Sequence, residues 1–197
     1  GSAEVSVVAD PTVSISGAGA VCVGGAVTLT ANVSGGTGTP TYQWKRDGNP
    51  VGTNSATYTT DNTLVAGNYV YTVEITQASG CSAASSGVNA NVVADPTVSI
   101  SGAGDVCVGG DVMLTANVSG GTGTTTYQWK RDGNPVGTNS ATYTTDNTLV
   151  AGNYVYTVEI TQASGCSAAS SGVNANVVAD PTVSISGAGD VCVGGDV

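Results

Sequence analysis

Five cysteines are the residues of this sequence with the clearest capacity for covalent chemistry. Cys107 follows Cys22 by 85 residues, Cys166 follows Cys81 by the same spacing, and Cys192 continues the first series. None of them forms a Cys-x-x-Cys motif, which disfavours a zinc ribbon or a thioredoxin-type redox site. The chain has no histidine, so serine–histidine triads are excluded and the most common metal ligand is missing. Disulfide formation is therefore the chemistry that these residues favour.

The cysteine spacing reflects an internal repeat of 85 residues, because residues 10–94 superimpose on residues 95–179. The four differences between the copies are Ala20 to Asp105, Ala26 to Asp111, Thr28 to Met113 and Pro40 to Thr125. A period of this length suits a string of small domains better than a solenoid, whose units run to about 50 residues. We predict a first repeat at 10–94, a second repeat at 95–179, and the first strand of a truncated third repeat at 180–197. Residues 1–9 are interpreted as a tag scar and the end of a preceding repeat, within a longer parent array.

Composition excludes several classes of partner. The chain has 14 acidic and 4 basic residues and a formal net charge of -10, with no basic stripe, so nucleic acid and anionic membranes are poor partners. No stretch approaches the ~18 apolar residues of a membrane span, so we expect no membrane insertion of this segment. No motif calls for a cofactor. We expect a soluble piece of a larger protein.

Alternating apolar and polar residues predict β-strands throughout, without any helical periodicity. Short strands are expected at 11–16, 26–33, 55–60, 69–76 and 82–93 of the first copy. A further strand carries Trp44 and ends in a tight turn at Asp47 and Gly48, because Asp-Gly tolerates positive φ. About seven short strands with regular turn signals predict an all-β fold of tandem antiparallel β-sandwiches.

The strand sequences resemble those of immunoglobulin-like domains. Gly-Gly-Ala-Val-Thr-Leu-Thr-Ala, Tyr-Gln-Trp-Lys-Arg-Asp-Gly and Leu-Val-Ala-Gly-Asn-Tyr-Val-Tyr are similar to the second, third and sixth strands of that fold. The resemblance makes Trp44 the core tryptophan and Tyr69 the corner tyrosine. Ala31 and Tyr71 stand where the family often carries its cross-sheet disulfide. The core residues expected from the two copies are Trp44, Tyr69, Tyr71, Trp129, Tyr154 and Tyr156.

Two cysteine motifs extend the resemblance. Val-Cys-Val-Gly-Gly before the second strand and Ser-Gly-Cys-Ser-Ala after the sixth are similar to immunoglobulin-like repeats in very large surface proteins of gliding bacteria. Those proteins include adhesins exported by the type IX secretion route. The resemblance implies an extracellular or bacterial cell-surface location and identifies no ligand.

The pairing of the cysteines stays open among several schemes. A bond within one copy is disfavoured, because Cys22 and Cys81 are expected at opposite ends of the sandwich, farther apart than the ~7 Å that a disulfide allows between Cα atoms. A bond between Cys22 and Cys166 would join successive copies. Another scheme pairs Cys81 with Cys107 and Cys166 with Cys192, and free or intermolecular thiols are a further option. Either bridged scheme between copies implies an oxidising, extracellular setting.

Other candidate sites receive a structural interpretation. Asp105 and Asp111 could contribute to a calcium site, but solvated turns are favoured. Lys45 and Glu74 could form an isopeptide crosslink, but their outward positions favour an exposed ion pair. Trp44 could stack on a sugar, but core packing is favoured. We therefore expect no catalytic, cofactor or metal site.

The sequence predicts a stalk or spacer in a secreted or surface-anchored bacterial adhesin, which could support surface adhesion or gliding. The alternative is a repeated glycan-binding module that gains affinity from multivalency. The expected partners are neighbouring repeats of the same chain and possible surface glycans or proteins. Residues 181–197 could also complete a sheet edge in another molecule. An enzyme is not expected, because no acid, base and nucleophile converge.

Overall fold

A computed structural model describes residues 7–187, 189–190 and 193. Contacts between Cα atoms divide the chain into two compact units. The first comprises the chain up to Val98 together with Val118–Tyr127 and Glu159–Ser170. The second comprises Ser99–Asn117, Gln128–Val158 and the chain from Ser171 onward. Two stretches of the second sequence copy therefore belong to the first unit.

Every regular element in the described part of the chain is a β-strand, and each copy contributes nine. The strands of the first copy are β1 (Thr12–Ser16), β2 (Ala20–Cys22), β3 (Thr28–Ser34), β4 (Pro40–Arg46), β5 (Asn49–Val51), β6 (Thr57–Thr59), β7 (Gly67–Gln77), β8 (Ser82–Ala84) and β9 (Val88–Val93). Those of the second copy are β10 (Thr97–Ser101), β11 (Asp105–Cys107), β12 (Met113–Ser119), β13 (Thr125–Arg131), β14 (Asn134–Val136), β15 (Thr142–Thr144), β16 (Gly152–Gln162), β17 (Ser167–Ala169) and β18 (Val173–Val178). The described residues contain no helix that is long and apolar enough to cross a membrane.

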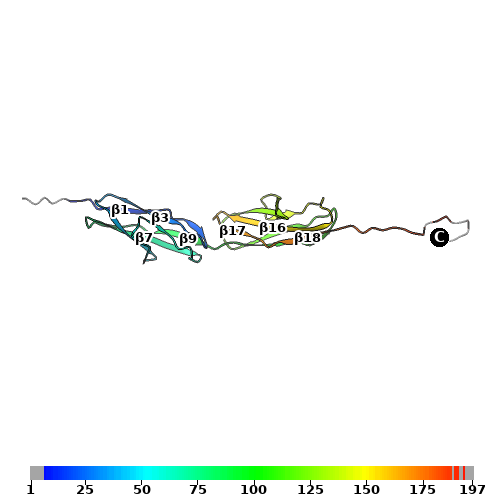
Figure 1. Ribbon diagram of the computed structural model, residues 1–197, viewed down its shortest axis with the longest axis horizontal. Coiled ribbons are helices and arrows are strands. Elements are labelled where there is room, and N and C mark those ends of the chain that lie inside the picture. Colours follow the sequence, from blue (N-terminus) through cyan, green and yellow to red (C-terminus); the bar gives the residue numbers. More distant parts are fainter. Residues whose placement is uncertain (1–6, 188, 191–192, 194–197) are drawn as a thin grey trace, which may run out of the picture. The chain divides into compact units, whose positions relative to one another are not determined.

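The strands of each copy form two sheets. In the first copy one sheet has the order β1-β3-β6, and the other has the order β2-β9-β7-β4-β5, with β8 also paired to β7. Figure 1 shows β1 and β3 in one layer and β7 and β9 in the other. The second copy repeats this arrangement with β10-β12-β15 and β11-β18-β16-β13-β14. The predicted all-β sandwich is confirmed for both copies.

Aromatic residues fill the centre of each sandwich. Trp44 and Tyr71 are both 0% exposed and pack with Leu29 and Ala31 in one buried cluster. Tyr58 links them, because its ring centroid lies 5.9 Å from that of Trp44 and 5.6 Å from that of Tyr71. Burial raises the pKa of the Tyr71 hydroxyl, as expected for a group whose charged form would lose its hydration. Packing thus occupies the positions where the immunoglobulin family often has a disulfide.

The second copy builds the same centre, with Trp129 and Tyr156 at 0% exposure and Tyr143 between them. Tyr69 and Tyr154 lie beside these centres rather than in them. The hydroxyl of Tyr69 donates to the carbonyl of Val65 at 3.0 Å, and Tyr154 makes the equivalent bond. This is the geometry of a tyrosine corner. Four of the six expected core residues are thus buried in the sandwich centres, whereas Tyr69 and Tyr154 are half-buried at the corners.

The Asp47–Gly48 turn between β4 and β5 has the predicted geometry. Both residues have positive φ, 50° and 82°, which suits a tight hairpin. The carboxylate of Asp47 also accepts a hydrogen bond from the backbone N–H of Val70 at 2.9 Å, which ties the turn to β7.

Three parts of the strand prediction are wrong. Asn49–Val51 forms β5, which pairs with β4, whereas the sequence predicted only a turn there. Residues 20–22 form β2, which pairs in parallel with β9, whereas the sequence predicted no strand there. The single strand expected over 82–93 is broken into β8 and β9. At the break, Ser85 accepts a hydrogen bond through Oγ from the N–H of Val73 at 3.0 Å and donates its own N–H to the Val73 carbonyl. A side chain thus replaces a backbone ladder bond.

Trp44→Ala should lower the free energy of unfolding of the first copy by about 3–5 kcal/mol, because it removes a fully buried indole. Denaturation under reducing conditions, followed by circular dichroism, should then show one transition shifted to lower denaturant and one at the wild-type midpoint. The fluorescence of the remaining Trp129 should follow the unshifted transition. Val65→Ala, at a 71% exposed position, is the control. A single shifted transition seen by both probes would show that the copies unfold together.

Candidate functional site

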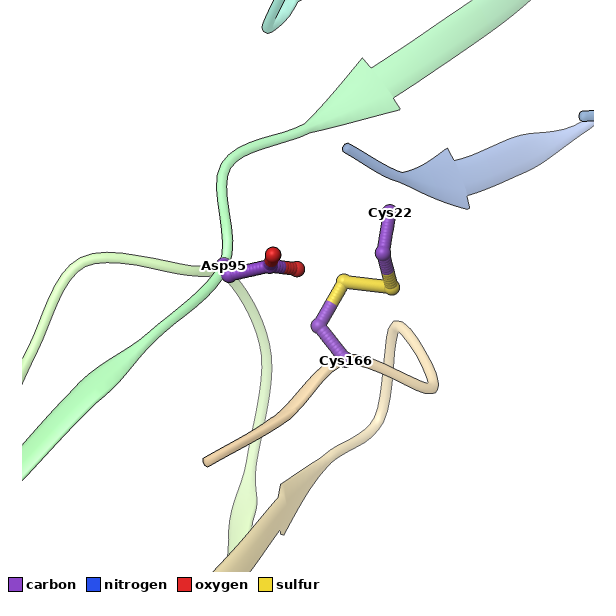
Figure 2. A group of neighbouring side chains, drawn as sticks. All are labelled: Cys22, Asp95 and Cys166. Carbon is purple, nitrogen blue, oxygen red and sulfur yellow. A yellow bond between two sulfur atoms is a disulfide. The ribbon is translucent and has the colours of Figure 1, made fainter. Parts of the chain in front are cut away.

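The structure contains one disulfide among its described cysteines, between Cys22 and Cys166, which are separated by 144 residues in sequence. Their Cα atoms lie 5.6 Å apart, within the usual range for a disulfide. Both residues belong to the first compact unit. Figure 2 shows the bond between the end of β2 and the turn that carries Cys166.

Backbone hydrogen bonds hold each cysteine in place. Cys22 ends β2 opposite Val93, and the next residue, Val23, donates its N–H to the Val93 carbonyl at 3.0 Å. Cys166 lies in the turn between β16 and β17, where its carbonyl accepts from the N–H of Gln162 at 2.8 Å. Cys166 is only 1% exposed. The two half-sites are thus fixed by the sheets that carry them.

The length of β7 explains why no bond forms within one copy. Cys22 lies beside the start of β7, because its neighbour Val21 pairs with Val92, which also pairs with Gly67. Cys81 lies beyond the other end of β7, where its carbonyl accepts from the N–H of Gln77. From Gly67 to Gln77 the strand spans about 33 Å. That distance is several times what a disulfide can bridge.

The other cysteines do not follow the alternative scheme. Cys81 and Cys107 are both free, so the structure does not contain a bond between them. Cys192 lies outside the described residues, and Cys166, its partner in that scheme, is bonded to Cys22 instead. Of the schemes that the sequence left open, the structure contains the bond between Cys22 and Cys166.

Asp95 is a third member of the site that the sequence analysis did not identify. It is exposed in the connection after β9, and Figure 2 shows its carboxylate directed toward the two sulfur atoms. One ligand atom from each of Cys22, Asp95 and Cys166 lies within 4.8 Å of the others. No other group of three potential ligands was found among the described residues. The sulfurs are joined to each other, however, so neither provides the thiolate that zinc prefers.

The carboxylate of Asp95 has an electrostatic consequence for the disulfide. Disulfides are reduced by attack of an anionic thiolate on one sulfur. A negative charge at this distance repels the attacking anion and also disfavours the thiolate that must leave. We therefore expect the acidic side chain to slow reduction of the bond.

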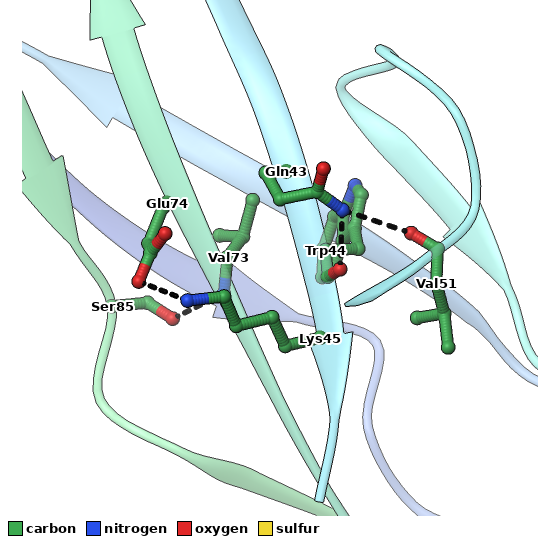
Figure 3. Close-up of polar contacts among 7 residues, drawn as sticks. All are labelled: Gln43, Trp44, Lys45, Val51, Val73, Glu74 and Ser85. Atoms are coloured by element: carbon green, nitrogen blue, oxygen red, sulfur yellow. Dashed lines mark hydrogen bonds and ion pairs between the residues drawn. The ribbon is translucent and has the colours of Figure 1, made fainter. Parts of the chain in front are cut away.

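The other candidate residues have structural roles. Trp44 and Trp129 are completely buried, so neither can stack on a sugar. Lys45 and Glu74 form an ion pair across β4 and β7, with side chains 28% and 50% exposed, as Figure 3 shows. An exposed pair of this kind contributes little to stability, and its solvation does not favour an isopeptide reaction. In the same view Gln43 donates to the carbonyls of Trp44 and Val51.

Carboxylates elsewhere also serve local structure. The backbone N–H and hydroxyl of Thr63 donate to Asp61 at 2.9 and 2.8 Å and lower its pKa. Asp105 and Asp111 belong to no three-ligand group within the described residues. Two equivalent hollows lie along β7–β8 and β16–β17, and Glu74 or Glu159 is the single ionisable residue in the lining of each. Such a lining offers no acid and base pair for catalysis.

Comparison with known proteins supports the fold. No protein-family model and no curated protein match this chain. Among solved structures, eight N-terminal immunoglobulin domains of Down Syndrome Cell Adhesion Molecule match with a TM-score of 0.51 at 17% identity, covering 87% of this chain and 24% of that one. Three N-terminal domains of the bacteriophage RB49 Highly Immunogenic Outer Capsid protein match with a TM-score of 0.48 at 24% identity, covering 86% and 59%. Fibronectin(III)-like modules of Clostridium thermocellum CbhA match with a TM-score of 0.47 at 17% identity, covering 84% and 94%.

Of these three structures, the adhesion molecule is the one with a TM-score above 0.5, and its likeness concerns the fold alone. The chain is a tandem of immunoglobulin-like β-sandwiches, and it spans about a quarter of the adhesion-molecule structure that it matches. The disulfide of this tandem lies outside the sandwich centres that Trp44 and Trp129 fill.

Asp95→Asn should accelerate reduction of the Cys22–Cys166 bond by dithiothreitol or glutathione about threefold at low salt, because one repulsive charge is removed. The difference in reduction rate between the variant and the wild type should become smaller in about 0.5 M salt, because salt screens the charge of Asp95. Asp10→Asn, the equivalent residue of the first copy, is the matched control. The rate is measured by quenching with a thiol-blocking reagent and counting modified cysteines by mass spectrometry. Equal rates for both variants at every salt concentration would contradict an electrostatic role.

Proposed function

We propose that this chain is a mechanical spacer, whose repeats are joined covalently so that tension extends it much less than it would extend an unbonded chain. The Cys22–Cys166 bond carries this proposal. Tandem immunoglobulin-like sandwiches suit a structural or adhesion-related role, and neither copy presents a catalytic constellation in its described residues.

The position of the bond determines which part of the chain can extend. Of the 196 Cα-to-Cα steps between the ends of this 197-residue chain, the bond bypasses 144 and leaves 52. At about 3.5 Å per step, the bonded chain extends to ~180 Å at most, compared with ~690 Å without the bond. The buried aromatic residues Trp44, Tyr71, Trp129 and Tyr156 lie inside the bypassed stretch, whereas β1, β17 and β18 lie outside it. Tension applied to the ends is therefore carried by the sulfur–sulfur bond rather than by the strands between Cys22 and Cys166.

The connection between the copies supports the same role. β9 ends at Val93 and β10 begins at Thr97, so three residues separate the last strand of one copy from the first strand of the next. Pro96 is buried in this connection. Short linkers with proline restrict bending more than long polar ones do.

The setting that we propose is a secreted or surface-anchored bacterial adhesin. A structural disulfide persists in oxidising compartments, which favours an extracellular location. The resemblance of the cysteine motifs to repeats in large surface proteins of gliding bacteria supports an adhesin that projects a distant binding region, in surface adhesion or gliding. Neighbouring repeats of the same protein are its nearest partners. The alternative, a glycan-binding module, is less well supported, because both tryptophans are buried and cannot stack on a sugar.

Pulling the oxidised chain from its two ends tests the spacer function. In single-molecule force spectroscopy with handles on terminal tags, the oxidised wild type should reach a contour of no more than ~180 Å between the ends. The Cys22→Ser variant should instead release about 500 Å more as both copies unfold. Reduction of the wild type should have the same effect.

Cys81→Ser combined with Cys107→Ser is the matched control, because it removes two cysteines and leaves the bond intact. This double variant should extend like the oxidised wild type. If the oxidised wild type extended as far as Cys22→Ser, the proposed mechanical function would be wrong. A glycan array probed with the same chain tests the alternative, and strong binding would favour that function instead.

A further inference from the structure

The two free cysteines are the repeat equivalents of the two bonded ones. Cys107 occupies in the second copy the position of Cys22 in the first, and Cys81 occupies in the first copy the position of Cys166 in the second. Cys22 is bonded to Cys166, whereas Cys81 and Cys107 have no partner. Each free cysteine therefore occupies a position whose equivalent in the other copy is disulfide-bonded.

Cys107 is held in the same way as the bonded Cys22. It ends β11 opposite Val178 of β18, in the parallel register that places Cys22 opposite Val93. The following valine, Val108, donates to the Val178 carbonyl at 3.0 Å, and the carbonyl of Cys107 accepts from Gly110 at 2.9 Å. Both distances are the same around Cys22. Cys107 is exposed, so its thiol is accessible to a partner.

The acidic neighbour of the bond is also repeated. Asp95 follows the last residue of β9 by two positions, and Asp180 follows the last residue of β18 by the same number. The sequence around Cys107 thus repeats every element of the half-site that Cys22 and Asp95 form with Cys166.

Cys81 is held in the same way as the bonded Cys166. The carbonyl of each cysteine accepts from the N–H of the glutamine that ends the preceding long strand, at 2.8 Å in both copies. The glycine before each cysteine donates to the carbonyl of that glutamine, also at 2.8 Å. The turn is the same, yet Cys81 is half-buried whereas Cys166 is 1% exposed. The difference is the one expected if Cys81 lacks its partner.

We propose that Cys107 forms a disulfide with the following repeat, at the counterpart of Cys166, and that Cys81 forms one with the preceding repeat, at the counterpart of Cys22. Each interior repeat is then bonded to both neighbours. The inference rests on the proposed function, because it extends the single bond to a continuous series. Each new bond forms when two thiols exchange with one oxidant disulfide, such as oxidised glutathione. The two cysteine sulfurs become joined, and the oxidant takes up two electrons and both protons and leaves as two thiols.

Such a series has a mechanical consequence that one bond does not have. The bonds overlap, because each begins at a cysteine inside the stretch that the previous one bypasses. After the bond from Cys22 to Cys166, the next cysteine from which a bond can start is Cys192, 26 residues further on. Two repeats then contribute about 90 Å of extensible chain instead of ~600 Å. The same limit of about 90 Å for every two repeats holds in an array of any length.

A three-repeat chain tests the proposal. It is made by adding residues 113–179 again after Val197, which completes the third copy and adds one cysteine, the counterpart of Cys166. Both chains are refolded in a glutathione redox buffer, their thiols are blocked, and the disulfides are mapped by mass spectrometry. The present chain should show three blocked thiols, at Cys81, Cys107 and Cys192. The longer chain should show two, because Cys107 joins the added cysteine.

Cys107→Ser in the three-repeat chain is the control. It should leave the Cys22–Cys166 bond intact and the added cysteine blocked as a free thiol. If Cys107 stays a free thiol or pairs with another cysteine in the longer chain while Cys22 is bonded to Cys166, the inference is wrong and the proposed function stands. If Cys22 and Cys166 are themselves not bonded, the proposed function is also wrong.

Discussion

The length of the central strand is the constraint on which this structure depends. β7 runs without interruption from Gly67 to Gln77 and separates the two cysteines of the first copy by about 33 Å, and β16 (Gly152–Gln162) does the same in the second copy. No rearrangement of side chains can close that gap. Each copy therefore presents one thiol at either end of its sandwich, and a bond can form only with a cysteine from outside the copy. A strand length, set by alternating apolar residues, thus decides the covalent connectivity of the chain.

Because the cysteines lie at the ends of the sandwich, the core must be stable without a disulfide. Ala31 and Tyr71 occupy the positions of the usual cross-sheet disulfide, and the ring of Tyr58 packs between those of Tyr71 and Trp44. A small residue combined with large aromatic rings fills the space that two sulfurs would occupy. In the chain-entropy model, closing the loop between Cys22 and Cys166 contributes about 5 kcal/mol, slightly more than a shorter loop within one copy would. A bond between copies therefore stabilises the fold at least as much as a bond within one copy would.

Local patterns predicted most of the fold, and the missing parts depend on contacts that are distant in sequence. The alternation of apolar and polar residues predicted the main strands, and the motifs around Trp44 and Tyr69 predicted the core and the tyrosine corner. β2 has only three residues and no alternation of apolar and polar residues. It forms because it pairs in parallel with β9. Ser85 breaks the last strand through a hydrogen bond to Val73 that has no local signature. Asp95 could not be assigned to the disulfide, because its approach to the sulfurs exists only after folding.

The pairing of Cys22 with Cys166 also bears on the order of folding and oxidation. In an unfolded chain the 59-residue separation between Cys22 and Cys81 closes more readily than the 144-residue separation to Cys166, by about fourfold from loop entropy. Random oxidation would therefore favour the bond within one copy, which the folded sandwich cannot accommodate. Formation of β7 before oxidation would hold the two thiols of the first copy apart and so favour the bond between copies. Near-identical neighbours are prone to exchange strands, and this order of events favours a bond between copies that have already folded separately.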